Sequence, residues 1–205
     1  IRSDSDLHTF GYRFKPWVGP PIATAAEILN YMDEVIEDNA LGGHIRYGHR
    51  IVSADWSSSE NLWTIEAEKA GTEERVRLTA GFLWMCQGYY RHGKGYTPEW
   101  PGMADFKGRI VHPQAWPHDL DYKGKRMIVI GSGATAATLV PNVAQDVEHV
   151  TMLQRSPTYF IPGRNAIDIA EQLRALQVDE AWIHEITRRQ ILKLQGEVGS
   201  NLVLA

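Results

Sequence analysis

An apolar run that ends in a glycine-rich turn constrains the fold of this 205-residue chain more than any other feature. Met127-Ile128-Val129-Ile130 leads directly into Gly131-Ser132-Gly133-Ala134-Thr135-Ala136. An apolar run followed by G-x-G-x-x-A is typical of a buried parallel strand, a tight turn and a helix that bind a dinucleotide. In that arrangement Gly131 makes the turn, Gly133 lets the backbone approach a pyrophosphate, and Ala136 lets the helix pack closely on the strand. An ordinary strand-to-helix turn would show the same pattern.

The residues after the next predicted strand indicate which dinucleotide would bind. This strand, His149 to Leu153, ends in Gln154-Arg155-Ser156, and Arg155 follows Gly131 by 24 positions (155 − 131). A carboxylate at this place accepts a hydrogen bond from the ribose 2′-OH of NAD or FAD, whereas a guanidinium can bind the 2′-phosphate of NADP with two hydrogen bonds. The sequence therefore predicts an NADP site with Arg155 and Ser156 at the phosphate, unless Arg155 is only a surface cation.

The composition excludes several classes of partner. With 21 basic and 25 acidic residues, the net charge of −4 gives no field that would attract nucleic acid or an anionic membrane surface. No apolar run is long enough for a membrane span, so we expect no integral membrane segment. Cys86 is the single cysteine, which rules out an intramolecular disulfide and favours a reducing, cytoplasmic location. Because Cys86 lies in an apolar run, we expect a buried and inert thiol.

The first ninety residues combine one helix with alternating strands. Thr24-Ala25-Ala26-Glu27 has the spacing of a capping box and begins a predicted helix over about residues 24–38. An apolar period of two then predicts an antiparallel meander with strands at 51–56, 61–68 and 75–79. Phe82 to Cys86 reads as one more strand, closed by Gly88. Gly88 would either contact a cofactor or only satisfy a turn.

The remaining segments are a connector and further helices. Residues 91–124 are rich in glycine, proline, histidine and tryptophan and are expected to form an irregular connector. The helix after the glycine turn, about 134–145, contains Pro141, where we expect a kink or a break. Two further helices are predicted at 168–176 and 179–195. The histidines lack the spacing of a helical metal pair, so no metal is expected.

A second motif lies in the connector, directly before the glycine turn. The pattern F-x-G-x-x-x-H-x-x-x-W-P, formed by Phe106, Gly108, His112, Trp116 and Pro117, resembles the fingerprint of type I Baeyer-Villiger monooxygenases. The related flavin-containing monooxygenases carry another aromatic residue at the place of Trp116. Further stretches resemble the ethionamide-activating group within this family, namely Arg2 to Asp6, Phe14 to Trp17, Gly88 to Tyr90 and Gln154 to Tyr159.

The resemblance implies an α/β flavoprotein fold with two dinucleotide-binding domains, of which this chain holds only a part. It implies that NADPH reduces FAD, and that the flavin then uses O2 to oxygenate a ketone to an ester or lactone, or to oxidise a sulfide or thioamide sulfur. Asp4 matches the family's active-site aspartate, which holds a catalytic arginine near the flavin, and His112 belongs to the linker that couples nicotinamide motion to the flavin. Arg2, Asp4 and Gly88 would contact cofactor. By themselves, Arg2 and Asp4 read as a solvated terminus and His112 as a structural loop residue.

The sequence also departs from the family pattern. No G-x-G-x-x-G for the FAD pyrophosphate precedes residue 100, and the matching region ends before the family's catalytic arginine. We therefore expect an internal segment, divided into 1–90 (remainder of the FAD domain, with helix and meander), 91–124 (linker), 125–165 (start of the NADP domain) and 166–205 (start of a helical insertion). The alternatives are a non-catalytic NADP-binding fragment and an N- or S-oxygenating flavin-containing monooxygenase. The oligomeric state stays open.

Overall fold

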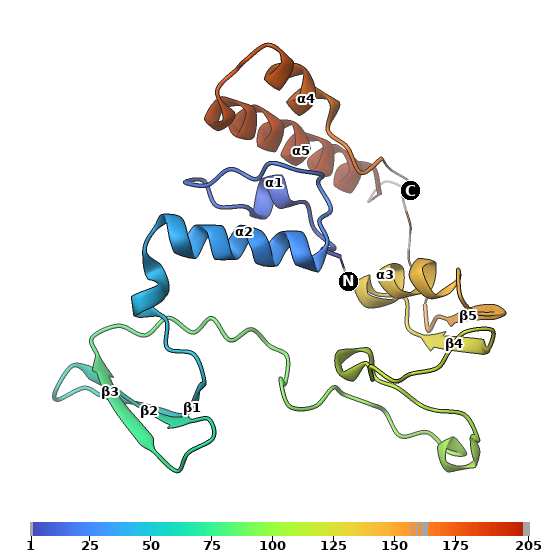
Figure 1. Cartoon of the computed structure of the whole chain (residues 1–205), viewed down its shortest axis with the longest axis horizontal. Coiled ribbons are helices and arrows are strands. Elements are labelled where there is room, and N and C mark those ends of the chain that lie inside the picture. The colour runs from blue at the N-terminus through green and yellow to red at the C-terminus, as the bar shows by residue number, and fades with distance from the viewer. Residues whose placement is uncertain (1, 157, 159, 161–163, 203–205) are drawn as a thin grey trace. The chain divides into compact units, whose positions relative to one another are not determined.

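The computed structural model describes residues 2–156, 158, 160 and 164–202, which form two compact units (Figure 1). The first unit combines residues up to 39 with those from 121 onward, and the second comprises residues 40–120. The first holds α1 (Leu7–Phe10), α2 (Ala25–Asp38), β4 (Arg126–Ile130), α3 (Ala134–Val143), β5 (His149–Leu153), α4 (Asp168–Ala175) and α5 (Glu180–Leu202). The second holds β1 (His49–Ser57), β2 (Leu62–Lys69) and β3 (Arg75–Ala80), with short 3-10 turns at Leu41–His44, Met103–Asp105 and Pro113–Ala115. The predicted domain boundaries stay predictions.

Helix α2 begins at the predicted capping box. The Thr24 hydroxyl accepts a hydrogen bond from the Glu27 N–H at 3.3 Å, and the Glu27 carboxylate accepts one from the Thr24 N–H at 2.7 Å. These two bonds satisfy backbone donors that the first turn of a helix leaves unpaired. The bond from the Thr24 N–H, together with one from the Thr24 hydroxyl to the same carboxylate at 2.7 Å, lowers the pKa of the Glu27 carboxyl, because both favour its charged form. The helix buries Tyr31 and Val35, which lie one turn apart.

Tyr31 anchors the irregular segment that precedes α2. Its side chain is 7% exposed and belongs to a small core formed by Leu7, Trp17, Ala23, Tyr31 and Val35. The Trp17 ring meets the Tyr31 ring edge-on, with centroids 5.4 Å apart. The Tyr31 hydroxyl accepts a hydrogen bond from the Tyr12 N–H at 2.8 Å and donates one to the Lys15 carbonyl at 2.7 Å. The loop between α1 and α2 is therefore fixed to α2, while α1 lies between α2 and α5 (Figure 1).

The predicted meander is confirmed. Strands β1, β2 and β3 form an antiparallel sheet in that order, with a shift in the pairing register between Ile51 and Ser53. Trp56 and Trp63 face each other across β1 and β2, and their ring centroids lie 5.5 Å apart. The central strand β2 carries the buried residues Ile65 and Ala67.

The strand predicted at Phe82 to Cys86 is wrong. These residues take no regular secondary structure, and Phe82, Trp84 and Met85 are 77%, 78% and 60% exposed. Cys86 is also exposed, so the predicted buried thiol is wrong as well. A strand needs a neighbour for its backbone hydrogen bonds, and none of the described strands pairs with this run. Its apolar composition alone could not show whether that neighbour is present.

The β4–α3–β5 unit is the predicted one. Strands β4 and β5 pair in parallel, with Ile130 opposite Leu153, and α3 packs on both strands. The helix continues past Pro141 to Val143, so a break at Pro141 is not found, whereas a kink there stays a prediction. Because Pro141 lies in the last turn, its missing N–H removes a hydrogen bond only near the end of the helix.

Helices α4 and α5 confirm the two helices predicted near the C-terminal end. Arg174 on α4 donates two hydrogen bonds to the Glu180 carboxylate, at 2.7 and 3.1 Å, and so closes the turn between the helices. Helix α5 contacts both α1 and α4. His8 on α1 and His184 on α5 are 1% and 5% exposed, and this burial lowers the pKa of each imidazole. None of the helices in the described ranges is long and apolar enough to cross a membrane.

Candidate nucleotide-binding site

The glycine turn has the geometry that a dinucleotide site needs. Gly131 has a φ of +119°, a backbone angle that residues other than glycine rarely adopt. Its N–H donates a hydrogen bond to the Leu153 carbonyl at 2.9 Å, which holds the turn against the end of β5. Gly133 is the N-cap of α3, and a Cβ there would meet nothing within 4 Å. A ligand can therefore approach the backbone at this point.

The N-terminus of α3 is open to an anion. No side chain caps the helix at Gly133 in the described structure, so its first N–H groups have no side-chain acceptor. Such groups carry a partial positive charge and bind phosphates. Ala134 and Thr135 are exposed at this end, whereas Ala136 is 5% exposed and packs within the unit. A small residue at position 136 therefore matches the close packing expected there.

The predicted phosphate residues lie at the same edge of the sheet. Arg155 and Ser156 follow β5 after one residue, Gln154, and the carboxyl ends of β4 and β5 are neighbours because the strands are parallel. The Ser132 hydroxyl lies 2.6 Å from the Thr158 hydroxyl, which joins the glycine turn to this loop. Arg155 is exposed and makes no ion pair with any residue that the structure describes. Its guanidinium is thus available to a phosphate.

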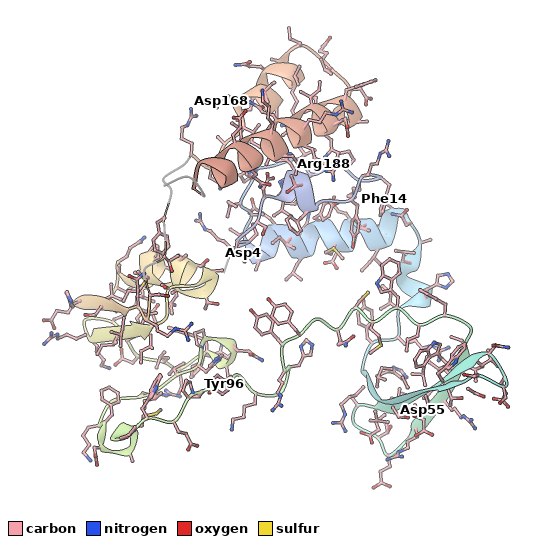
Figure 2. The ribbon with its side chains drawn as sticks, turned by 180° about the vertical axis from the view of Figure 1, so that it is seen from behind. Asp4, Phe14, Asp55, Tyr96, Asp168 and Arg188 are labelled. Carbon is pink, nitrogen blue, oxygen red and sulfur yellow. The ribbon has the colours of Figure 1, made fainter. Side chains whose placement is uncertain are left out.

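Asp4 and Arg2 lie in the N-terminal segment of the same unit. The Arg2 backbone pairs with Thr24 in an antiparallel bridge, and Figure 2 shows Asp4 beside the N-terminal end of α2. Asp4 is exposed, and its carboxylate accepts a hydrogen bond from the Ser5 hydroxyl at 3.1 Å. The roles assigned to Arg2 and Asp4 by resemblance stay predictions.

Sequence reasoning missed Asn165. Its side-chain oxygen accepts a hydrogen bond from the Ile22 N–H at 2.8 Å, and its side-chain nitrogen donates to the Ile22 carbonyl at 2.9 Å. Asn165 therefore pairs with the backbone of a residue 143 positions away and ties the segment after Arg155 to the segment that precedes α2. No local pattern signals such a contact, because its partner is a main chain remote in sequence.

The connector motif has a defined local structure in the second unit. A Cβ on Gly108 would lie 2.5 Å from the Phe106 ring, so the ring packs directly over this glycine. His112 Nδ1 accepts a hydrogen bond from the Gln114 N–H at 3.2 Å. The proton of the neutral imidazole is therefore on Nε2. Trp116 and Pro117 are half-buried.

Gly88 has a φ of +70°, which establishes a turn requirement. Whether it also contacts a cofactor, and whether His112 acts in catalysis, stay predictions. Among the described residues, no group of three histidine, cysteine or acidic side chains could hold a metal ion.

The described residues fit one nucleotide but do not form a site for a second. The open glycine turn, the uncapped end of α3 and Arg155 provide groups for a pyrophosphate and a 2′-phosphate. For FAD, the described residues offer the Gly88 turn and the Asp4 carboxylate, and neither is a phosphate cradle.

A parallel βαβ unit with this turn defines a dinucleotide-binding α/β protein. The profile of the flavin-binding monooxygenase-like (FMO-like) family matches residues 19–168, and the chain belongs to this family. The FAD-containing monooxygenase EthA of Mycolicibacterium smegmatis is 55% identical over 162 residues, which are 78% of this chain and 32% of that protein.

Two solved structures agree with this assignment. Oxidized steroid monooxygenase bound to NADP matches with a TM-score of 0.67 and 30% identity, over 90% of this chain and 34% of that one. Cyclohexanone-bound cyclohexanone monooxygenase matches with a TM-score of 0.66 and 26% identity, over 86% and 34%. The chain thus spans about a third of the length of these proteins. The predicted family and fold class are confirmed.

Proposed function

We propose that this chain is the NADP-binding part of an FAD-dependent monooxygenase, which uses NADPH and O2 to oxygenate a ketone beside its carbonyl or to oxidise a sulfide or thioamide sulfur. The observation that carries the proposal is the single edge where the Gly131 turn, the end of α3 and Arg155 come together. The names of the relatives support it, since one is an FAD-containing monooxygenase and one solved structure holds NADP. The flavin, when bound, supplies the oxygen chemistry.

The chain's own residues would bind and orient the reductant. The first N–H groups of α3 would hold the pyrophosphate, and Arg155 would pair with the 2′-phosphate. The Asp4 carboxylate would hold a catalytic arginine by charge pairing, and His112 would stand in the linker between the nucleotides.

A non-catalytic NADP-binding protein is the second candidate, because the described residues form only one phosphate-binding turn. A visible spectrum of the purified protein, recorded after incubation with FAD and removal of the unbound flavin, separates the two, together with an assay of NADPH oxidation. A flavin-bound protein that oxidises NADPH supports the monooxygenase, and a colourless, inert one supports the alternative. Conversion of a ketone to an ester would exclude a monooxygenase restricted to nitrogen and sulfur. A cytoplasmic location stays a prediction.

Replacing Arg155 with alanine tests the cofactor assignment. A hydrogen-bonded charge contact contributes about 1.5 to 3 kcal/mol, so NADPH should bind roughly 10- to 150-fold more weakly while NADH binding hardly changes. Titration of the protein with each nucleotide measures both affinities. Arg126→Ala is the matched control, because Arg126 is also exposed but lies at the start of β4, whereas the Gly131 turn follows the other end of that strand. An unchanged preference for NADPH in Arg155→Ala would show that this side chain does not bind the phosphate.

A further inference from the structure

The segment before the connector motif folds back onto the residues around His112. The Gln114 side-chain nitrogen donates a hydrogen bond to the Arg91 carbonyl at 2.6 Å and a longer one to the His92 carbonyl at 3.4 Å. Gln114 is also the residue whose N–H donates to His112. One glutamine therefore holds both the preceding chain and the imidazole.

Gly95 lies directly beneath the His112 ring. A Cβ built on Gly95 would lie 2.2 Å from both Cε1 and Nδ1 of His112, and 2.7 Å from Cγ. Carbon atoms cannot approach this closely, so any side chain at this position would force the ring to move. The φ of Gly95 lies outside the left-handed region, so alanine is compatible with the backbone. What excludes a side chain at Gly95 is the imidazole itself.

Displacing the ring would also change its hydrogen bonding. Nδ1 is one of the two ring atoms closest to the Gly95 Cβ position, and it is the atom that accepts from the Gln114 N–H. This bond keeps the proton of the neutral imidazole on Nε2. The absence of a side chain at Gly95 thus preserves the position of the imidazole ring and keeps its proton on Nε2, where it can be donated.

We propose that Gly95 is a positioning residue for His112: it provides the space that lets the imidazole lie against the connector backbone with its Nε2–H available as a donor. The functional consequence rests on the proposed monooxygenase, in which His112 stands between the two nucleotides. Gly95 immediately precedes Tyr96, which is labelled in Figure 2.

Gly93 offers a matched control within the same segment. It lies two positions before Gly95, its φ is also outside the left-handed region, and a Cβ there would meet nothing within 4 Å. Gly93→Ala and Gly95→Ala make the same chemical change in the same loop, but only the second variant meets the imidazole.

The first experiment probes the ring directly and needs no enzyme activity. Diethylpyrocarbonate modifies exposed imidazoles, and mass spectrometry gives the rate at each histidine of the full-length protein. In Gly95→Ala the rate at His112 should rise about fivefold, which corresponds to about 1 kcal/mol for one lost neutral hydrogen bond. Gly93→Ala should match the parent. An unchanged His112 rate in Gly95→Ala, or an equal rise at the other histidines, would overturn the proposal.

The second experiment measures the consequence in the flavin-loaded holoenzyme. Gly95→Ala should lower the amount of oxygenated product per NADPH consumed, while the KM for NADPH, which depends on Arg155, stays unchanged. In a His112→Ala background the Gly95→Ala change should have no further effect. An equal loss in both backgrounds would refute positioning through His112. A holoenzyme that makes no product at all would instead contradict the proposed function, and the modification experiment would still test the contact.

Discussion

The hydroxyl of Tyr31 makes two hydrogen bonds to backbone groups in the N-terminal core. Tyr31→Phe removes this hydroxyl with little change in the shape of the side chain. The substitution keeps the ring that meets Trp17 edge-on. It deletes the acceptor of the Tyr12 N–H and the donor to the Lys15 carbonyl, which lie 2.8 and 2.7 Å from the hydroxyl oxygen. Both backbone groups belong to the loop between α1 and α2, so the change isolates the anchoring of that loop.

The expected loss is about 2 kcal/mol, because each of two neutral hydrogen bonds contributes about 1 kcal/mol. Tyr31 is 7% exposed, so water reaches the site poorly and cannot replace the hydroxyl at full strength. In a chain of this size, a loss of about 2 kcal/mol lowers the melting temperature by about 4 to 8 °C.

Urea denaturation followed by tryptophan fluorescence measures this loss, since Trp17 lies in the affected core. The midpoint should fall while the slope with urea stays constant. Tyr12→Phe is the control, because the Tyr12 ring stacks near Tyr31 but its hydroxyl makes no hydrogen bond with any described residue. Equal midpoints for Tyr31→Phe and Tyr12→Phe would refute the anchoring role.

Two further predictions concern the first unit. Burial lowers the pKa of His8 and His184 below the ordinary value of 6.5, so the unfolded chain binds more protons in mildly acidic solution. The stabilisation that the two buried, neutral imidazoles contribute is therefore complete above pH 6.5, and the free energy of unfolding should fall as the pH drops below that value. Urea titrations between about pH 7.5 and pH 5.5 measure this change, and a flat profile would contradict the prediction. Asn165→Ala should remove both bonds to Ile22 and speed hydrogen exchange at the Ile22 amide about fivefold, by about 1 kcal/mol, and unchanged exchange would show that the bond does not protect it.

Features with a local cause could be predicted from the sequence. The capping box at Thr24 and Glu27 is a contact across three positions, so its residue types define it. The turn at Gly131 needs a backbone conformation that glycine favours, and the strand, turn and helix follow one another in sequence. The placement of Arg155 beside this turn follows from the parallel pairing of β4 and β5.

Features that depend on a distant neighbour could not be predicted. Phe82 to Cys86 has the composition of a strand, but strand formation depends on a partner, and the run is exposed and irregular. Asn165 and Ile22 are 143 positions apart, and an asparagine in a loop gives no signal of its partner. Gly95 reads as one of several connector glycines, and only the packing of His112 distinguishes it from Gly93.

The exposed sulfur of Cys86 makes this protein unusually simple to label. It is the single cysteine among these 205 residues and its side chain is accessible, so a maleimide dye would attach to this chain at one known position. The dye would stand two residues before the Gly88 turn. Because an isoalloxazine ring quenches nearby fluorophores, loss of emission from a dye at Cys86 when FAD is added would test whether a flavin binds near this turn.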